Sequence, residues 1–270
     1  MILLVDSGST KTDWIALNAE GAEIFQTQTF GLNPQVLSAE ILTERIINNY
    51  AGCGTTKPKE LIKGVFDEFF DKAQLIDIKE DTYAALYATT KKNEPGIVCI
   101  IGTGSNCSLY DGENIEQKVT SLGYILMDDG SGNYFGRQLL RDFHFNKIPK
   151  ELAYEFAKQF DLTAESIKNH LYKMPNPNTY LAQFARFLIT NKDHEYCKKL
   201  IRKGFKLFIE HQILQFKNAK EIPVHFVGSI SFYLQDELRD LLKEYDLKIG
   251  KVLKRPIEGL VAYHKNYIMV

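Results

Sequence analysis

An apolar run followed by a turn of small polar residues opens this chain. Residues 2–5 are an unbroken apolar run, which is typical of a strand buried on both faces. Residues 6–12 are polar and rich in small hydroxyl side chains, and residues 14–17 are apolar again. The pattern therefore predicts two strands joined by a polar loop.

The same pattern recurs later in the chain. Residues 97–101 are a second apolar run, residues 102–106 a second small polar turn, and residues 107–110 a second outgoing strand. Two such hairpins predict a duplicated domain with one phosphate loop from each half. Neither loop is a Walker A motif, because no Gly-Lys-Ser/Thr follows a four-residue spacer. The alternative is that both are ordinary glycine-rich β-turns.

The residue types of the first turn favour phosphate binding. Gly8 lets the backbone approach a ligand closely, while Ser9, Thr10 and Thr12 add hydroxyls beside backbone N–H groups. Asp6 stands at the end of the preceding strand, where its carboxylate is available to a magnesium ion. We therefore interpret this hairpin as a phosphate cradle.

The remainder of the first half predicts strands and helices in alternation. Residues 23–27 form a third expected strand, apolar spacing predicts a helix around residues 37–46, and residues 74–79 read as a further strand. Asp81 then begins a helix, either as its N-cap or as a functional carboxylate at a strand-to-helix junction. Asn33 precedes a proline, and local sequence alone favours a turn residue there.

The second half contains a long helical stretch. The acids Asp128 and Asp129 precede a helix expected near residues 133–143, either as a solvated cap or as part of a site. Residues 149–217 are helical in pattern and form an insertion. Gly204 lies inside its last helix, where glycine costs about 1 kcal/mol against alanine, so it indicates close packing by another helix or by a flat ligand.

Three further elements follow the insertion. Residues 222–227 predict a strand that ends in the small-residue turn Gly228-Ser229, after which a helix is expected over residues 232–244. A strand over residues 247–253 and a final helix beginning near Pro256 complete the chain.

Composition bounds the class of protein. The 270 residues are enough for two domains of about 100–150 residues each, and the hydrophobic fraction of 44% allows sizeable cores. The net charge of −1 and the lack of a strongly basic block argue against a nucleic-acid partner. A helix that spans a membrane needs about 18 apolar residues, and no apolar run in the sequence approaches that length. We therefore expect no membrane partner. Four cysteines without a Cys-x-x-Cys pair, and no visible signal peptide, predict free thiols in the cytoplasm.

Four strings of this chain resemble the N-acetylglucosamine kinase family. They are Asp6-Ser7-Gly8-Ser9-Thr10-Lys11-Thr12-Asp13, Gly102-Thr103-Gly104-Ser105-Asn106-Cys107, Asp128-Asp129-Gly130-Ser131-Gly132 and Phe226-Val227-Gly228-Ser229. The family belongs to the BadF-type ATPase group of the actin, sugar kinase and heat-shock ATPase superfamily. The resemblance runs from residue 2 to His264, and the second and third strings together are its specific part.

The resemblance implies an α/β fold with two ribonuclease-H-like (actin-like ATPase) domains and an all-helical insertion in the second. The implied division is residues 1–93 and residues 94–256, with the insertion at about 149–217. Residues 257–270 would form a C-terminal helix that packs back on the N-terminal domain. A second copy of the chain, in a homodimer, is a candidate partner.

The resemblance also implies an ATP-dependent kinase that phosphorylates the primary hydroxyl of an amino sugar, with N-acetylglucosamine as first candidate and ATP and Mg²⁺ as cofactors. Asp81 matches the catalytic base, and Asp6 the residue that orients hydrated magnesium. The implied nucleotide-binding residues are Gly8, Ser9, Thr10, Lys11, Thr12, Thr103, Gly104, Gly204, Gly228 and Ser229. The implied sugar-binding residues are Asn33, Ser105, Asn106, Gly123, Tyr124 and Asp128.

Two departures from the family pattern bear on the substrate. Met127 stands where the family has a glycine beside the first acid, and Ser7 and Ser9 replace two glycines of the first loop. Several alternatives therefore stay open: a kinase of N-acetylmuramic acid or glucosamine, an ATPase of the dehydratase-activator type without an iron–sulfur cluster, and a non-catalytic sugar sensor.

Overall fold

The computed structural model describes residues 1–7, 11–30, 60, 63–64, 66–68 and 70–269. The chain forms two compact units, the first made of residues 1–92 and 255–270 and the second of residues 93–254. The helix expected near residues 37–46 lies outside the described residues.

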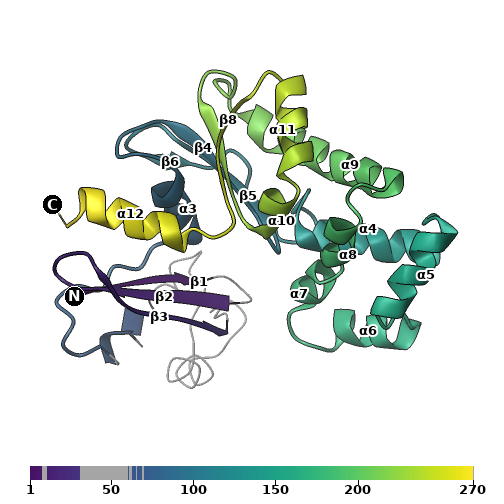
Figure 1. The fold of residues 1–270 in the computed structure, drawn as a ribbon, viewed down its shortest axis with the longest axis horizontal. Helices are drawn as coiled ribbons and strands as arrows, with labels where there is room; N and C mark the ends of the chain where they lie inside the picture. The colour runs from purple at the N-terminus through teal and green to yellow at the C-terminus, as the bar shows by residue number, and fades with distance from the viewer. Residues whose placement is uncertain (8–10, 31–59, 61–62, 65, 69, 270) are drawn as a thin grey trace. The chain divides into compact units, whose positions relative to one another are not determined.

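The first unit contains a three-stranded antiparallel sheet in the order β1-β2-β3. Its strands are β1 (Ile2–Ser7), β2 (Lys11–Leu17) and β3 (Glu23–Phe30) (Figure 1). In the β1–β2 pair Asp6 lies opposite Asp13, and Ser7 lies opposite Thr12. The two strands predicted on either side of the first polar turn are therefore confirmed.

Two helices from distant parts of the sequence complete this unit. Helices α3 (Asp81–Thr89) and α12 (Ile257–Tyr267) contact each other, and both contact β1 (Figure 1). Gly259 permits the close approach of the helices, because a Cβ there would lie 2.5 Å from the Cα of Ala88. The core between helix α12 and the sheet comprises Leu4, Ile15, Leu17, Ile257, Leu260 and Val261.

The strand predicted over residues 74–79 is wrong. These residues are described, and they form no strand. Leu75 is 83% exposed, and Ile76 and Ile78 are only half-buried. A short apolar segment that neither packs on a core nor pairs with another strand gains too little from burial to hold a strand conformation.

The second unit contains a five-stranded sheet in the order β6-β5-β4-β7-β8. Strands β4 and β5 form an antiparallel hairpin, whereas β4, β7 and β8 run parallel. The parallel strand β7 is apolar and buried over most of its length, as parallel strands covered on both faces require. The strands are β4 (Gly96–Ile101), β5 (Ser105–Tyr110), β6 (Ile115–Glu116), β7 (Pro223–Val227) and β8 (Lys248–Leu253).

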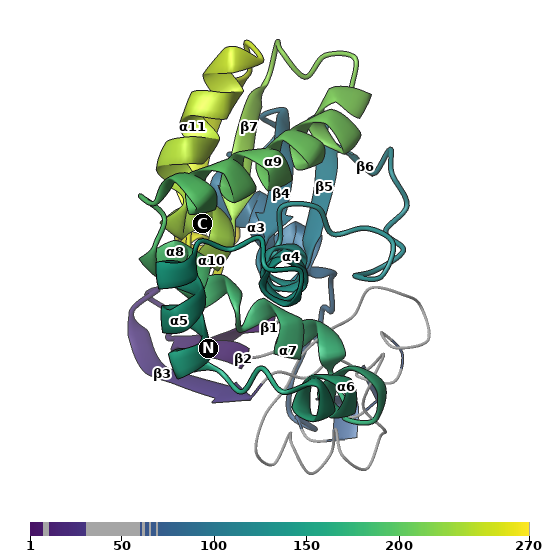
Figure 2. The ribbon, with the colours of Figure 1, turned by 90° about the vertical axis from the view of Figure 1, so that its right-hand side faces the viewer.

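Between β6 and β7 the described regular structure is entirely helical. Helix α9 and helix α11 pack against each other in this unit (Figure 2). The helices before β7 are α4 (Gly132–His144), α5 (Lys150–Gln159), α6 (Ala164–Tyr172), α7 (Pro177–Ala182), α8 (Ala185–Thr190), α9 (Glu195–His211) and the 3-10 turn η1 (Ile213–Gln215). The helix expected over residues 232–244 is divided into α10 (Ser229–Tyr233) and α11 (Gln235–Glu244).

His225 is a buried histidine inside the sheet of the second unit. Its Nδ1 accepts the backbone N–H of Lys251 at 3.0 Å, and burial lowers its pKa to about 4. Gly250 lies against its ring, since a Cβ there would be 2.4 Å from Nδ1. His225 is therefore a neutral structural residue at physiological pH.

None of the helices in the described part of the chain is both long and apolar enough to cross a membrane.

Candidate functional site

The end of the first hairpin gathers carboxylates. Asp6 is the last residue but one of β1 and is half-buried. Because directly paired residues share one face of a sheet, the side chains of Asp6 and Asp13 lie on the same face. Burial, and then the charges of Asp13 and Asp81, raise the pKa of Asp6 to about 7, while Lys11 and Arg255 act in the opposite direction.

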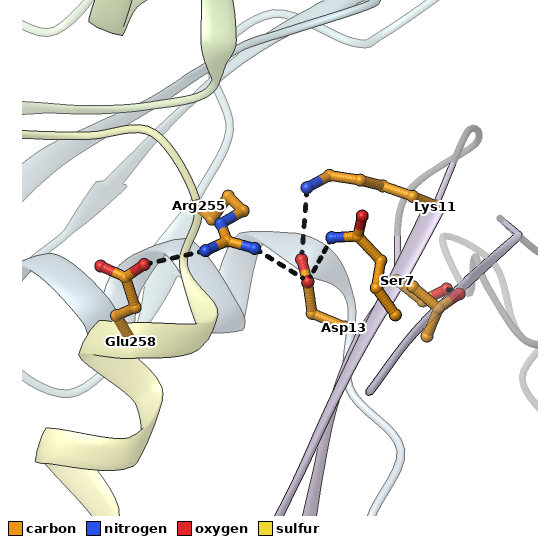
Figure 3. Close-up of polar contacts among 7 residues, drawn as sticks. Ser7, Lys11, Asp13, Arg255 and Glu258 are labelled. Atoms are coloured by element: carbon orange, nitrogen blue, oxygen red, sulfur yellow. Dashed lines mark hydrogen bonds and ion pairs between the residues drawn. The ribbon is translucent and has the colours of Figure 1, made fainter. Parts of the chain in front are cut away.

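Asp13 is held by several donors. Its Oδ1 accepts from Nε2 of Gln28 at 2.7 Å and from Nη1 of Arg255 at 3.1 Å, and its Oδ2 lies 3.5 Å from Nζ of Lys11. Figure 3 shows Arg255 between the carboxylates of Asp13 and Glu258, with Lys11 reaching toward Asp13. The buried charge of Asp13 is therefore neutralised by two cations.

The residues predicted to bind phosphate in this hairpin are only partly described. Lys11 begins β2 with a side chain 44% exposed, and the Thr12 hydroxyl is buried 2.6 Å from the Ser7 hydroxyl. The structure thus places the Lys11 ammonium at the exit of the loop and the Thr12 hydroxyl inside the hairpin. Three of the predicted loop residues, together with one predicted sugar ligand, lie outside the described residues; these are Gly8, Ser9, Thr10 and Asn33.

Asp81 is the first residue of α3 and not its N-cap. The cap position is Glu80, which makes no side-chain cap hydrogen bond. The Asp81 side chain reaches the surface, while the protein around it raises its pKa by desolvation, against the backbone N–H groups of Thr82 and Asp81. A carboxylate with a raised pKa is a stronger base, which suits a group that accepts a proton.

The residues of the first hairpin fit a magnesium ion held through water. Magnesium usually keeps several waters and takes one or two carboxylates together with substrate phosphates. Within the described ranges no three His, Cys, Asp or Glu residues gather into a metal-binding group, which is compatible with a magnesium ion that keeps most of its waters. Burial and the neighbouring carboxylates raise the pKa of Asp6, and a bound cation would favour its charged form.

The second hairpin turns on residues 102–104. The Gly102 N–H donates to the Gly104 carbonyl at 2.9 Å, and the Thr103 carbonyl accepts two donors from Asn133: the backbone N–H at 3.0 Å and Nδ2 at 2.7 Å. The C=O and N–H of a trans peptide point in opposite directions. The Gly104 N–H is therefore turned away from Asn133, and a loop N–H aimed outward suits an anion.

Asp128 clamps this loop. It adopts a left-handed conformation with a φ of 66° and is buried. Its Oδ1 accepts the Ser105 N–H at 3.3 Å, and its Oδ2 accepts Nδ2 of Asn133 at 2.8 Å. A Cβ on Gly104 would lie 2.8 Å from Oδ2, so glycine is required there. Burial raises the pKa of Asp128, while these hydrogen bonds lower it.

Asn133 is the residue that the sequence interpretation missed. It is 1% exposed, and its amide nitrogen bridges the Thr103 carbonyl and the Asp128 carboxylate. Both partners are acceptors, which fixes the orientation of the amide group. Its only sequence signal is its position, a polar residue directly after the Gly130-Ser131-Gly132 string and before an aromatic pair.

Neither Asp128 nor Asp129 is the N-cap of helix α4. The N-cap of α4 is Ser131, whose Oγ accepts the Tyr134 N–H at 3.3 Å. Asp129 instead lies with Oδ2 2.9 Å from Nδ1 of His211.

The other predicted sugar ligands occupy β5 and the turn before Asp128. Ser105 Oγ donates to the Asp129 carbonyl at 2.9 Å, and Asn106 Oδ1 accepts the Cys107 N–H at 2.7 Å. Met127 N–H closes a turn onto the Gly123 carbonyl at 2.9 Å. Arg137 holds the Tyr124 carbonyl at 3.0 Å. The structure therefore brings Ser105 and Asp128 together.

The two glycines predicted near the adenosine differ in their surroundings. A Cβ on Gly204 would lie 2.5 Å from the Phe135 ring, so this glycine serves the packing of α9 on α4. A Cβ on Gly228, whose φ is 129°, would lie 2.2 Å from the Ile101 carbonyl, which places the β7–α10 turn beside the second hairpin. Ser229 is exposed at the start of α10. The nucleotide roles of these residues stay predictions.

Comparisons with known proteins identify similar structures. One, from Porphyromonas gingivalis and provisionally named an N-acetylglucosamine kinase, shares 33% identity over 99% of each chain, with a TM-score of 0.90. A protein from Chromobacterium violaceum with the same provisional name shares 14% identity over 97% of each chain, with a TM-score of 0.72. A ROK family glucokinase from Streptomyces griseus, in complex with glucose and AMPPNP, shares 12% identity over 97% of each chain, with a TM-score of 0.58. The last two show the fold alone. No protein-family model and no curated protein matches the chain.

Proposed function

Because this chain belongs to the N-acetylglucosamine kinase family, we propose that it transfers the terminal phosphoryl group of ATP to the primary hydroxyl of N-acetylglucosamine, giving the 6-phosphate. The enzyme is an ATP-dependent carbohydrate kinase with a mixed α/β fold. The observation that carries the proposal is the 33% identity over 99% of both chains with the Porphyromonas gingivalis protein.

Phosphoryl transfer requires positioning and charge neutralisation more than covalent chemistry from the protein. Asp81 accepts the proton of the sugar hydroxyl, a contribution worth roughly 10²–10⁴-fold. Asp6 holds hydrated magnesium, which when bound neutralises charge on the phosphates. The nucleotide is bound by Gly8, Ser9, Thr10, Lys11, Thr12, Thr103, Gly104, Gly204, Gly228 and Ser229, as the family resemblance implies.

The sugar-binding assignment follows the same resemblance. Asn33, Ser105, Asn106, Gly123, Tyr124 and Asp128 bind the hydroxyls and the N-acetyl group. Two observations support the part played by the second hairpin. Asp128 is fixed by two hydrogen bonds before any ligand arrives, and Ser105 is bonded to the same acid-bearing turn. A preorganised group loses little conformational freedom on binding.

Finer features of the fold belong to this proposal as well. They are two actin-like domains, a helical insertion at about 149–217, and a homodimer. A cytoplasmic location is part of it, supported by the free thiols Cys99, Cys107 and Cys197.

The alternative activity is that of a dehydratase-activating ATPase. Activators of that class carry an iron–sulfur cluster on cysteines. Cys99 and Cys107 face each other across β4 and β5 with their sulfurs 3.4 Å apart, and both are buried. Thiols enclosed in a strand pair are poor ligands for a cluster at a protein surface, which argues against an activator that carries a cluster; the cluster-free ATPase is distinguished from the kinase by the sugar dependence of ADP release.

The test is an assay of ADP release with purified protein, ATP and Mg²⁺ against a panel of sugars. We expect N-acetylglucosamine to be used best, ahead of glucosamine and N-acetylmuramic acid, with phosphorus NMR identifying a 6-phosphate. ADP release that no sugar accelerates would overturn the proposal and favour the ATPase. Faster release with N-acetylmuramic acid would correct the substrate and leave the kinase in place.

A further inference from the structure

The first hairpin brings two carboxylates close together. Asp6 and Asp13 lie directly opposite on one face of the β1–β2 pair, and like charges in that position destabilise a sheet. The Asp13 side chain is only 5% exposed, so water screens its charge poorly. A nucleotide would bring further negative charge to the same place.

Two cationic side chains lie beside Asp13, and their contacts with its carboxylate differ. Arg255 Nη1 donates to Asp13 Oδ1 at 3.1 Å, and its side chain is 29% exposed. Lys11 Nζ lies 3.5 Å from Oδ2, and its side chain is 44% exposed. Arg255 therefore makes the better hydrogen bond, while Lys11 keeps much of its ammonium open to the surroundings.

Arg255 is itself held in place (Figure 3). Its Nη2 donates to Oε1 of Glu258 at 3.1 Å, in the first turn of α12. Helix α12 packs against the same sheet through Ile257, Leu260 and Val261. The guanidinium is thus a fixed cation carried to β2 by a segment that is remote in sequence.

We propose that Arg255 is a positioning residue for nucleotide binding: it shares the charge of Asp13 with Lys11, and so weakens the attraction of Asp13 for the Lys11 ammonium, which can then turn to a phosphate. Without Arg255, Lys11 is the remaining cation beside Asp13 and is drawn to it. The hairpin also gains one unit of negative charge. Both effects repel a polyanion. The inference rests on the proposed function only in placing the phosphates of the nucleotide at this hairpin.

The experiment is a titration of the full-length protein with Mg·ADP by calorimetry, without sugar. Arg255→Gln keeps a hydrogen-bonding amide and removes the charge, and we expect it to weaken Mg·ADP on the order of tenfold. Asp13→Asn combined with Arg255→Gln removes both charges, and its affinity should return to within about threefold of the unaltered protein. Arg255→Lys keeps the charge without the planar fork, so it should bind Mg·ADP more tightly than Arg255→Gln.

Glu258→Gln is the matched control. It removes the charge of the exposed partner, keeps an acceptor oxygen for the same guanidinium and leaves the Asp13 pair intact, so Mg·ADP affinity should stay within about threefold of the unaltered protein. If Arg255→Gln lowers the melting temperature while binding Mg·ADP normally, Arg255 is merely structural and the proposal is wrong. Failure of the double variant to regain affinity would equally refute charge neutralisation.

Two outcomes keep this test separate from that of the proposed function. An unaltered protein that binds no Mg·ADP contradicts the kinase itself. Should Arg255→Gln not fold, Asp13→Asn alone is compared with the double variant, and the proposal requires the two to bind Mg·ADP within about threefold of each other, because Arg255 acts through Asp13. Much weaker binding by the double variant would overturn it, since Arg255 would then act on the nucleotide directly.

Discussion

The two hairpins share a plan but are held by different forces. The β1–β2 hairpin is fixed by charges, with Asp13 between Lys11 and Arg255. The β4–β5 hairpin is fixed by a neutral amide, that of Asn133, which donates to the Thr103 carbonyl and to the one buried carboxylate of Asp128. The strength of a charged contact depends on pH, on salt concentration and on nearby anions. The strength of an amide hydrogen bond depends on the geometry of its donor and acceptor.

Because of this difference, we expect the two units to contribute to function in different ways. In the first unit burial, and then the charges of Asp13 and Asp81, raise the pKa of Asp6 to about 7, so the charge of this group is expected to change when a cation binds. In the second unit the Asp128 carboxylate already has two donors, and its loop has little freedom to move. We expect substitutions in the first unit to alter chemistry and binding, and those in the second to alter geometry.

The largest effect is expected at Asp81. Asp81→Asn removes the proposed base while keeping its shape, and turnover should fall at least about a hundredfold. Sugar binding, measured by calorimetry, should survive. Glu80→Gln is the matched control, because it removes the adjacent acid and should keep turnover near normal. Normal turnover in Asp81→Asn would mean that Asp81 only begins a helix.

The next effect tests the amide-held hairpin. Asn133→Asp places an acceptor against the Thr103 carbonyl and the Asp128 carboxylate, which reverses two hydrogen bonds and should destabilise the fold by about 2 kcal/mol or more. Mg·ADP affinity should fall with it, because the Gly104 N–H loses its orientation. Denaturant unfolding and calorimetry measure the two effects.

Asn191→Asp is the control for that substitution. Asn191 Nδ2 donates to the Phe187 carbonyl at 2.9 Å in a different part of the same unit. We expect lower stability with unchanged nucleotide affinity. Equal loss of affinity in both variants would show that Asn133 acts through general stability.

A smaller effect is expected from pH, with opposite signs in the two units. The folded protein keeps the Asp6 proton up to a pKa of about 7, whereas the unfolded chain releases it near 3.8, so this group destabilises the fold as pH rises between those values. Asp6→Asn should therefore raise the melting temperature above pH 7 and leave it unchanged near pH 4. Thermal melts without Mg²⁺ measure this, and a constant difference at all pH values would contradict it.

His225 supplies the opposite case. Its folded pKa of about 4 lies below the ordinary value of 6.5, so the stability that it contributes is complete above pH 6.5 and is lost as pH falls toward 4. His225→Gln should lower the melting temperature most at neutral pH and least near pH 4.

The smallest effect concerns sugar choice. Met127 is half-buried next to Asp128 and adds a flexible side chain where the family has glycine. If it narrows the sugar site, N-acetylglucosamine is used better than N-acetylmuramic acid, and Met127→Gly brings their kcat/KM values several-fold closer. Equal rates on both sugars in the unaltered enzyme would exclude this role.

Local pattern was sufficient for the two hairpins, because each is built from neighbouring residues. The apolar runs and small polar turns predict β1, β2, β4 and β5 directly. The same reasoning failed over residues 74–79, where three apolar residues pair with none of the strands that the structure describes. Sequence periodicity reports which residues prefer burial, but whether a core exists beside them is decided by tertiary structure.

The residues that hold the hairpins could not be found in this way. Arg255 and Asp13 are 242 positions apart, and Asn133 and Thr103 are 30 apart. Nothing in the local sequence of Arg255 distinguishes it from a surface arginine. The motif residues could be predicted because they match a family pattern. The residues that hold them in place, such as Arg255 and Asn133, could not, because their contacts form only in the folded chain.

The discontinuity of the first unit has a consequence for how the protein is made. A ribosome delivers residues 1–92 first and residues 255–270 last, with the whole second unit between them. Until α12 emerges, Leu4, Ile15 and Leu17 lack the helix that covers them. The second unit can fold during synthesis, while the first must wait until residues 255–270 have been synthesised, with its apolar sheet face exposed to chaperones in the meantime.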